Sequence, residues 1–226
     1  MIRPVKYNPM KNQKLAIVGA TGFVGSAILE EALGREYPII AIARNTDKIA
    51  AKNPNLEKKE LDITDETALS EALKGVDTVI SAYNPGWKNP DIYHDTLVNY
   101  PKIISAVKKA GIKRLQMVGG AGSLLLPDGK RVMDGKLPEE IRGGVESLAE
   151  VFYRYLQPEK GLDWVFFSPA GNLAPGPRTG KYRLGTDHLI VDGNGKSSIS
   201  VKDYAKAMVD EAENPQHHRQ RFTIGY

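Results

Sequence analysis

Hydrophobic positions recur with two different periods along this chain. Short runs of consecutive apolar residues, bounded by turn-forming residues, are typical of buried strands. Segments with apolar residues three and four positions apart follow most of these runs and indicate amphipathic helices. The predicted strands are residues 14–19, 37–43, 56–61, 76–81, 113–119 and 162–168, and the predicted helices are residues 23–33, 64–73, 91–110 and 138–156. Because strands alternate with helices, we expect an α/β protein with a Rossmann-type doubly wound, mostly parallel sheet.

The ends of the predicted helices carry residues that commonly begin or stop a helix. Gly34 follows the first helix as a C-terminal glycine, and Thr64 is expected to cap the second. Pro101 is expected to interrupt or bend the third helix, because proline has no amide hydrogen to donate. Gly143–Gly144 are expected to weaken the fourth.

The C-terminal third differs in composition from the rest, since residues 169–180 are rich in Gly and Pro. Its predicted elements are two short strands at 181–184 and 188–191, a helix that runs from a Ser200 cap to Glu213, and a strand at 221–224. We interpret residues from about 169 to 226 as a small substrate-side lobe of a single domain that spans residues 1–226.

The first 13 residues contain Arg3, Lys6 and Lys11 without an apolar stretch behind them, which argues against a secretory signal. We expect residues 1–13 to form an extended N-terminal arm, with Met10 as an alternative start.

The charge and cysteine content of the chain argue against several functional classes. The net charge is +4, but the 31 basic and 27 acidic residues are interspersed, so we expect a solvated surface and no nucleic-acid partner. The chain has no cysteine, which excludes disulfides, thiolate zinc sites and cysteine catalysis. No apolar run approaches the roughly 20 residues that cross a bilayer. We therefore expect a cytoplasmic protein that acts on a small-molecule substrate and has no membrane partner.

A glycine-rich turn joins the first predicted strand to the first predicted helix. Gly19 permits the tight turn, Gly22 lets the backbone approach a pyrophosphate, and Gly25 lets the helix pack close to the strand. The helix N-terminus then offers free amides and a positive dipole to phosphates. The predicted cofactor-binding residues of this turn are Gly19, Thr21, Gly22, Phe23, Val24 and Gly25. Spacing, strand and helix together predict a dinucleotide site.

The end of the second predicted strand bears on the choice of dinucleotide. NAD-preferring sites place a carboxylate there for the ribose hydroxyls, whereas this chain has Arg44, followed by Lys48 one turn later. A guanidinium pairs well with a 2′-phosphate, so NADP(H) is favoured, with NAD(H) as the alternative. The competing interpretation is that Arg44 is a solvated charge at a strand end.

Together with the glycine turn, several further segments of this chain resemble those of the short-chain dehydrogenase/reductase superfamily. More narrowly, the chain is similar to its atypical NAD(P)-binding branch: NmrA-like proteins, biliverdin and flavin reductase-like proteins, and bacterial proteins labelled NADH-flavin reductase or NAD-dependent epimerase/dehydratase. The segments that carry the resemblance are Arg44, Asp62-Ile63, Ser81-Ala82, Val118–Leu124 and Asp163–Pro169.

The resemblance implies positions for residues that follow the strands. Asp62 and Ile63 are expected to flank the adenine. The residues expected on the nicotinamide side are Ser81, Ala82 and Tyr83, with the segments Gly119–Ser123 and Pro169–Asn172 closing over it.

One departure from the superfamily pattern affects the expected chemistry. Many active members carry Tyr-x-x-x-Lys on the helix after the fifth strand, where the lysine lowers the pKa of the tyrosine for proton relay. The corresponding window, residues 138–150, contains neither Tyr nor Lys. Tyr7–Lys11 matches the spacing but precedes the first strand. Standard ketone or sugar-epimerase chemistry is therefore not expected.

Other side chains have both a chemical and a structural interpretation. Ser123 follows the fifth strand, where it would hydrogen-bond a substrate carbonyl or satisfy its own loop. Tyr83 and Trp87, on the loop after the fourth strand, would stack on a flat ligand or fold the loop down. Ser123 and Tyr83 are the candidate catalytic residues. Tyr153 and Tyr155 are expected to be packing residues.

The histidines do not suggest a metal site. His217 and His218 are adjacent, so their side chains point apart, and His94 is expected at the surface.

Two hypotheses about function follow. The first is an NAD(P)H-dependent oxidoreductase that transfers hydride to a small or flat acceptor, such as a flavin or quinone, without the tyrosine–lysine pair. The second is a non-catalytic NADP(H)-binding redox sensor, as the NmrA-like resemblance allows. A residual isomerase or dehydratase is a third hypothesis.

Overall fold

A computed structural model describes residues 13–226. The predicted arm, except Gln13, and the Tyr7–Lys11 match lie outside these residues. The strands are β1 (Leu15–Val18), β2 (Ile39–Ala43), β3 (Leu56–Glu60), β4 (Thr78–Ser81), β5 (Arg114–Val118), β6 (Asp163–Ser168), β7 (Asn172–Ala174), β8 (Arg183–Gly185), β9 (Ser198–Ser200) and β10 (Gln220–Gly225). The helices are α1 (Phe23–Gly34), α2 (Glu66–Ala72), α3 (Ile92–Lys109), α4 (Glu139–Val151) and α5 (Val201–Glu213).

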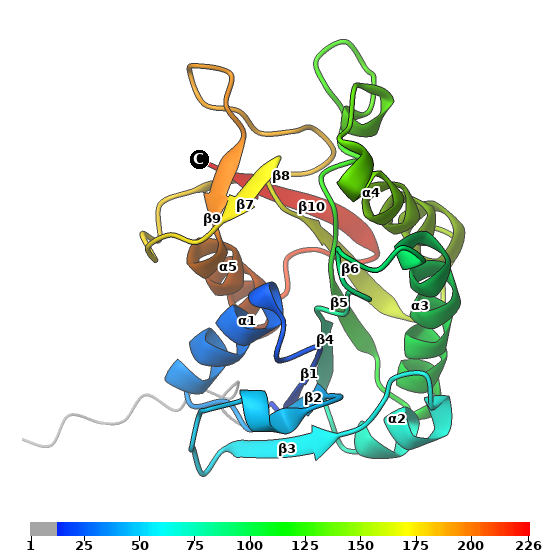
Figure 1. The fold of residues 1–226 in the computed structure, drawn as a ribbon. Helices are drawn as coiled ribbons and strands as arrows, with labels where there is room; N and C mark the ends of the chain where they lie inside the picture. The colour runs from blue at the N-terminus through cyan, green and yellow to red at the C-terminus, as the bar shows by residue number, and fades with distance from the viewer. Residues whose placement is uncertain (1–12) are drawn as a thin grey trace, which may run out of the picture.

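Eight strands form one sheet in the order β3-β2-β1-β4-β5-β6-β10-β8 (Figure 1). All neighbours in it are parallel except β10 and β8. The order reverses between β1 and β4, which is the switch point where open α/β sheets bind ligands beyond the carboxyl ends of their strands. The predicted doubly wound, mostly parallel fold is confirmed.

Alternate residues of the central strands face opposite helical layers, as the pleat requires. In β1, Leu15 and Ile17 pack on the layer of α1 and α5, whereas Ala16 and Val18 pack on the layer of α2, α3 and α4. Figure 1 shows α1 beside α5 on one face and the other three helices on the opposite face. This double burial explains why the sequence shows continuous apolar runs for these strands.

Three details of the helices differ from the sequence predictions. Gly34 is the last residue of α1 and has no positive φ; the chain turns at Glu36, which has a φ of 66°. Asp65, and not Thr64, caps α2, since its carboxylate accepts from the amide of Ala68 at 2.9 Å. Helix α3 runs through Pro101 without a break, because buried residues on both sides of it, such as Tyr100 and Ile103, hold the helix against the sheet.

The fourth predicted helix and the C-terminal lobe also differ in part. Residues 152–156 form a π-helical turn after α4, so the helix is not uniformly α-helical. Strands β7 and β9 pair with each other, and neither was predicted. Residues 188–191 are not a strand; His188 only forms an isolated bridge with Leu125. The Ser200 cap and α5 are confirmed, since Ser200 Oγ accepts from the amide of Asp203 at 3.0 Å.

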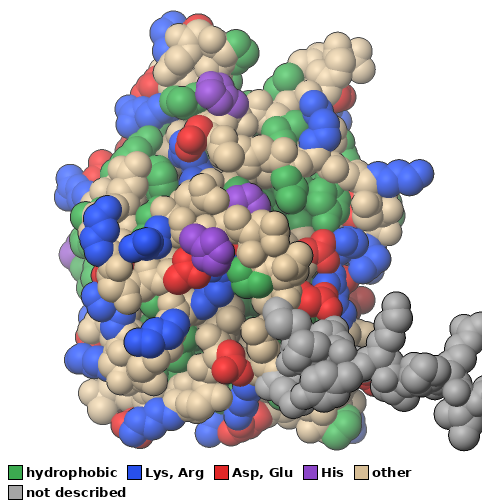
Figure 2. All heavy atoms as spheres, turned by 180° about the vertical axis from the view of Figure 1, so that it is seen from behind, with side chains coloured by type: hydrophobic (Ala, Val, Ile, Leu, Met, Phe, Trp, Pro, Cys, Tyr) green, Lys and Arg blue, Asp and Glu red, His purple; other side chains and the backbone are tan. Residues whose placement is uncertain are grey.

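On the face shown in Figure 2, basic and acidic side chains are interspersed, as the mixed charges of the sequence predict. Among the described helices, none combines the length and apolar character needed to span a membrane.

Candidate functional site

A cavity of about 1000 Å³ lies beyond the carboxyl ends of the central strands. Its position at the switch between β1 and β4 is the one expected for a nucleotide site in this fold. Most of the residues predicted for the site line it: Gly19, Thr21, Gly22, Phe23, Val24, Arg44, Asp62, Ile63, Ala82, Tyr83, Gly119 and Pro169. Three predicted residues, Gly25, Ser81 and Ser123, do not.

The glycine turn approaches its neighbours so closely that side chains would collide there. Gly19 has a φ of +81°, and a Cβ on it would lie 2.7 Å from the carbonyl oxygen of Ala82. A Cβ on Gly25 would lie 2.1 Å from the carbonyl oxygen of Gly19, so Gly25 acts in the packing of α1 against the turn and not in the cavity wall. Within the described residues no side chain caps α1 at Gly22, and its first turn has no acidic residue. The amides at this helix end are therefore available to an anion such as a pyrophosphate.

One end of the cavity is basic. Arg44 and Lys48 follow β2 and are exposed. Their side chains make no hydrogen bond or ion pair with residues 13–226. Lys102 reaches this end from α3 and donates to the carbonyl oxygen of Thr64 at 3.4 Å. The amide of Thr64 also donates to Asp62, which keeps the pKa of that carboxyl below its usual value, and Arg44 adds to this effect. This end of the cavity therefore presents three basic side chains, Arg44, Lys48 and Lys102, to an anionic ligand.

Tyr83 lies between the two ends and is held rigidly. Its hydroxyl accepts from Asn99 Nδ2 at 2.8 Å, and its carbonyl oxygen accepts from the hydroxyl of Tyr100 at 2.7 Å. The two tyrosine rings meet edge to face with centroids 5.6 Å apart. Burial raises the pKa of the Tyr83 phenol, although the Asn99 hydrogen bond opposes this shift. The phenol therefore stays protonated at neutral pH.

The loop after β4 forms one wall of the other end. Asn89 Nδ2 donates to Asp95 Oδ2 at 2.8 Å, which fixes the loop to α3. Trp87 is 51% exposed, yet its ring lies against α4, since a Cβ on Gly144 would be 2.5 Å from it. Trp87 thus folds the loop onto α4 and also lines the cavity.

Helix α4 supplies an apolar wall beside this loop. Ile141, Val145 and Leu148 line the cavity at helical spacing. The tyrosine and lysine of the wider superfamily would lie on this helix, and no titratable side chain of α4 lines the cavity here. Gly122 packs under the same wall, because a Cβ on it would be 2.2 Å from Val145 Cγ1.

The serines at the ends of β4 and β5 are buried away from the cavity. Ser123 is only 2% exposed, and its hydroxyl accepts from Arg221 Nη1 at 2.9 Å. Arg221 in turn pairs with Asp187 at 2.6 Å, so Ser123 belongs to a structural network. This arrangement agrees with the interpretation of Ser123 as a residue that satisfies its own loop. Ser81 is fully buried at the end of β4.

The histidines lie apart from the cavity. His217 contacts Glu211 and His218 contacts Asp163, and Arg114 pairs with both carboxylates. No cluster of metal-ligating side chains exists among residues 13–226. His94 is exposed. Tyr153 and Tyr155 pack against the core of the α2–α4 layer, in keeping with their predicted role.

Some lining residues were missed by the sequence analysis. Asp95, Asn99 and Lys102 line the cavity from one face of α3. Their spacing of four and three residues was a readable signal, since such residues share a helix face. The α4 wall gave no comparable signal, because its apolar residues are indistinguishable from core residues in sequence.

Comparison with known proteins gives a consistent result. Residues 19–215 match the NAD(P)H-binding family. The chain is 37% identical to uncharacterized protein YwnB of Bacillus subtilis, over 93% of this chain and 97% of that protein.

Two solved structures extend the comparison. A "putative epimerase" from Bacteroides thetaiotaomicron is 51% identical with a TM-score of 0.90, covering 96% of this chain and 98% of that one. A "putative NADH-flavin reductase" from Streptococcus pneumoniae is 30% identical with a TM-score of 0.80, covering 95% and 99%.

Proposed function

The chain belongs to the NAD(P)H-binding family, and from that premise we propose that it is a reductase that passes hydride from NADPH to a small, flat acceptor such as a quinone or flavin. One observation carries this proposal. The cavity joins a glycine cradle and a basic end to a second end walled by Trp87 and the apolar face of α4. Such a wall suits a planar apolar ligand, and the face of α4 that lines the cavity carries no tyrosine–lysine pair for sugar or ketone chemistry.

The basic end supports NADPH over NADH. The side chains of Arg44 and Lys48 make no hydrogen bond or ion pair with the described residues, and the carboxylate expected of an NAD site is absent from the end of β2. A 2′-phosphate would supply the partner that Arg44 lacks. Asp62 is engaged by the Thr64 amide, which limits its use for a ribose hydroxyl.

The protein's share of the reaction is positioning and the exclusion of water. When bound, NADPH supplies a hydride, which carries both electrons, and the acceptor takes one further proton from solvent. The glycine turn and the α1 N-terminus hold the phosphates, while Trp87 and the α4 wall place the acceptor and keep the site dry. Tyr83 stays protonated and fixed by Asn99, so it shapes the site without changing charge. Positioning of this kind contributes several kcal/mol to lowering a barrier.

Absorbance at the reduced-nicotinamide band tests the proposal. The purified protein is incubated with NADPH or NADH and with menadione, riboflavin, FMN or a small carbonyl compound. We expect oxidation of NADPH with a quinone or flavin and little with the carbonyl compounds. Tight NADPH binding without any oxidation would favour the redox-sensor hypothesis, and preference for NADH would show that Arg44 has no role in selecting the cofactor.

A further inference from the structure

The face of α3 that lines the cavity carries opposite charges at its two ends. Asp95 and Lys102 both line the cavity and are seven residues apart, which is about 10 Å along a helix. Lys102 reaches the carbonyl oxygen of Thr64, beside Asp62. Asp95 is bound to Asn89, on the loop that also carries Trp87. The helix thus connects the end where the acceptor would lie, near its N-terminus, with the basic adenosine end.

Among residues 13–226, one carboxylate and no cationic side chain line that acceptor end. The basic residues that line the cavity are Arg44, Lys48 and Lys102, all at the opposite end. Arg142 of α4 pairs with Glu139 at 3.1 Å and lies outside the lining. Lys88 and Lys136 adjoin lining residues in the sequence, but they are exposed and do not line the cavity. The side chains around the acceptor end are Tyr83, Asn84, Trp87, Asn89, Asp95, Val132, Leu137, Ile141, Val145, Leu148 and Asn172.

We infer that the acceptor subsite selects an uncharged planar ring system, a quinone or an unphosphorylated flavin, and discriminates against acceptors that carry a phosphate or carboxylate. This inference rests on the proposed function. An anionic group moved into an apolar site without a cationic partner is destabilised, and Asp95 adds repulsion of like charge. An uncharged ring does not have this desolvation cost, and it gains favourable contact with Trp87 and the α4 wall.

Asp95 is the residue through which the selection is tested, because it brings the only charge to this end within the described lining. Riboflavin and FMN form a matched pair of acceptors, since they share the reacting ring and differ in one phosphate, which carries a charge near −2 at neutral pH. Asp91 offers a matched control variant: it lies one turn earlier at the start of α3, is exposed and does not line the cavity.

The experiment compares wild type, Asp95→Asn and Asp91→Asn with both flavins at saturating NADPH. We expect wild type to prefer riboflavin over FMN by about tenfold in kcat/KM, as a partly screened charge pair allows. Asp95→Asn should reduce that preference by about threefold or more, and Asp91→Asn should leave it unchanged. A preference for FMN, or a preference that Asp95→Asn leaves unaltered, would overturn the inference while the proposed function stands.

Binding provides a second readout that does not depend on turnover. Quenching of flavin fluorescence by the protein with NADP⁺ present should give a lower Kd for riboflavin than for FMN, and Asp95→Asn should narrow the gap. Equal affinities in wild type would contradict the inference. If NADPH binds but neither a flavin nor menadione oxidises it, the proposed function itself fails, and the inference falls with it.

Discussion

Arg44 stands at the end of β2 with its guanidinium exposed at the cavity and no hydrogen bond or ion pair to the described chain. Arginine in this situation has five donors in a fixed fork, which match a phosphate better than a ribose hydroxyl. Lys48 and Lys102 reinforce the positive charge at this end of the cavity. We therefore expect cofactor choice to depend on one arginine and two supporting lysines.

Replacing Arg44 by Ala should separate the two cofactors. We expect NADPH affinity to fall about tenfold to a hundredfold, which corresponds to roughly 1.4 to 2.7 kcal/mol for a charged hydrogen-bonded contact. NADH affinity should change little, because NADH lacks the 2′-phosphate. Fluorescence titration of the bound reduced nicotinamide measures both values, and an equal loss for the two nucleotides would assign Arg44 a structural role instead.

Tyr83→Phe tests whether the phenol is a proton donor or part of the scaffold. Removing the hydroxyl leaves Asn99 Nδ2, which is largely buried, without its acceptor, so the free energy of unfolding should fall by about 1–3 kcal/mol. Because the proton is expected from solvent, kcat with a quinone should change less than about tenfold, below the usual effect of losing a general acid. A loss above a hundredfold would make Tyr83 catalytic. Tyr93→Phe, at an exposed position on α3, is the control.

Helix α1 depends on a close approach to the glycine turn. Gly25→Ala would place a Cβ 2.1 Å from the carbonyl oxygen of Gly19, so the turn would have to move. We expect a loss of about 1–3 kcal/mol in unfolding free energy, as for overpacking, together with weaker NADPH binding.

Gly34→Ala is the matched control on the same helix. Nothing lies within 4 Å of a Cβ at Gly34, so the substitution should stabilise the protein by about 0.5–1 kcal/mol and leave NADPH binding unchanged. Chemical denaturation with and without NADPH measures both variants. Equal behaviour of the two alanine variants would show that the close contact at Gly25 has no consequence.

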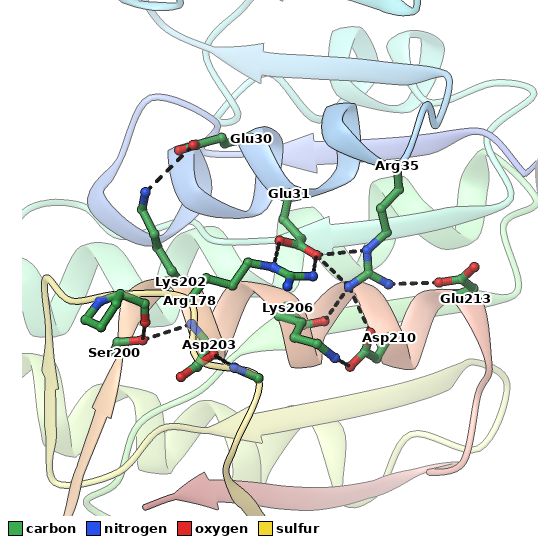
Figure 3. A network of polar contacts seen from close by, with 12 residues as sticks. Glu30, Glu31, Arg35, Arg178, Ser200, Lys202, Asp203, Lys206, Asp210 and Glu213 are labelled. Carbon is green, nitrogen blue, oxygen red and sulfur yellow. Dashed lines mark hydrogen bonds and ion pairs between the residues drawn. The ribbon is translucent and has the colours of Figure 1, made fainter.

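Helix α5 anchors the Gly/Pro-rich segment of the C-terminal lobe through Asp203, which Figure 3 shows beside Ser200. Its carboxylate accepts from Thr179 Oγ1 at 2.6 Å, from the Gly180 amide at 2.7 Å and from the Tyr226 hydroxyl at 2.8 Å. Burial alone would raise the pKa of Asp203, but these hydrogen bonds outweigh it and the pKa lies below its ordinary value of 3.8. The stability that this group contributes is therefore fully present at neutral pH.

Asp203→Asn should destabilise the protein in a pH-dependent way. At pH 7 we expect a loss of about 1–3 kcal/mol, because hydrogen bonds to a charged acceptor are replaced by neutral ones. The difference from wild type should narrow below about pH 4 and disappear as the pH falls through the lowered pKa of Asp203 in the folded state. Denaturant titrations at a series of pH values measure this difference in unfolding free energy. Asp91→Asn, at an exposed position, is the control. A difference independent of pH would mean that the charge does not matter.

A second polar cluster joins α1 to α5 and to the same segment (Figure 3). Glu31 is only 11% exposed and accepts from both Arg35 and Arg178, while Arg35 also pairs with Asp210 and Glu213. The Arg178 hydrogen bond is the main reason that the pKa of Glu31 lies below its usual value. The two helices and the lobe are thus held together by contacts that span 147 to 178 residues of sequence.

For the whole molecule, the parts that sequence predicted are those with local causes. The β1–turn–α1 unit and the Ser200 cap are each determined by residues close together in the sequence, so their spacing was enough to predict them. The pairing of β7 with β9 depends on two three-residue strands, which carry too little periodicity to recognise.

The partly wrong expectations have non-local causes. Ser123 was a candidate for substrate contact, yet its hydroxyl is bound by Arg221, 98 residues away, which no local pattern reveals. Helix α3 continues through Pro101 because tertiary packing outweighs the lost hydrogen bond. The apolar face of α4 forms part of the site only because the fold places it beside Trp87.

The most direct test of the central claim is a single-turnover experiment. Protein preloaded with NADPH is mixed rapidly with menadione while absorbance of the reduced nicotinamide is followed. We predict oxidation that saturates with menadione, exceeds the rate without protein and slows when deuterium occupies one of the two C4 positions of the cofactor. Bound NADPH that is oxidised no faster than free NADPH would contradict the account and leave a chain that binds the nucleotide without using it.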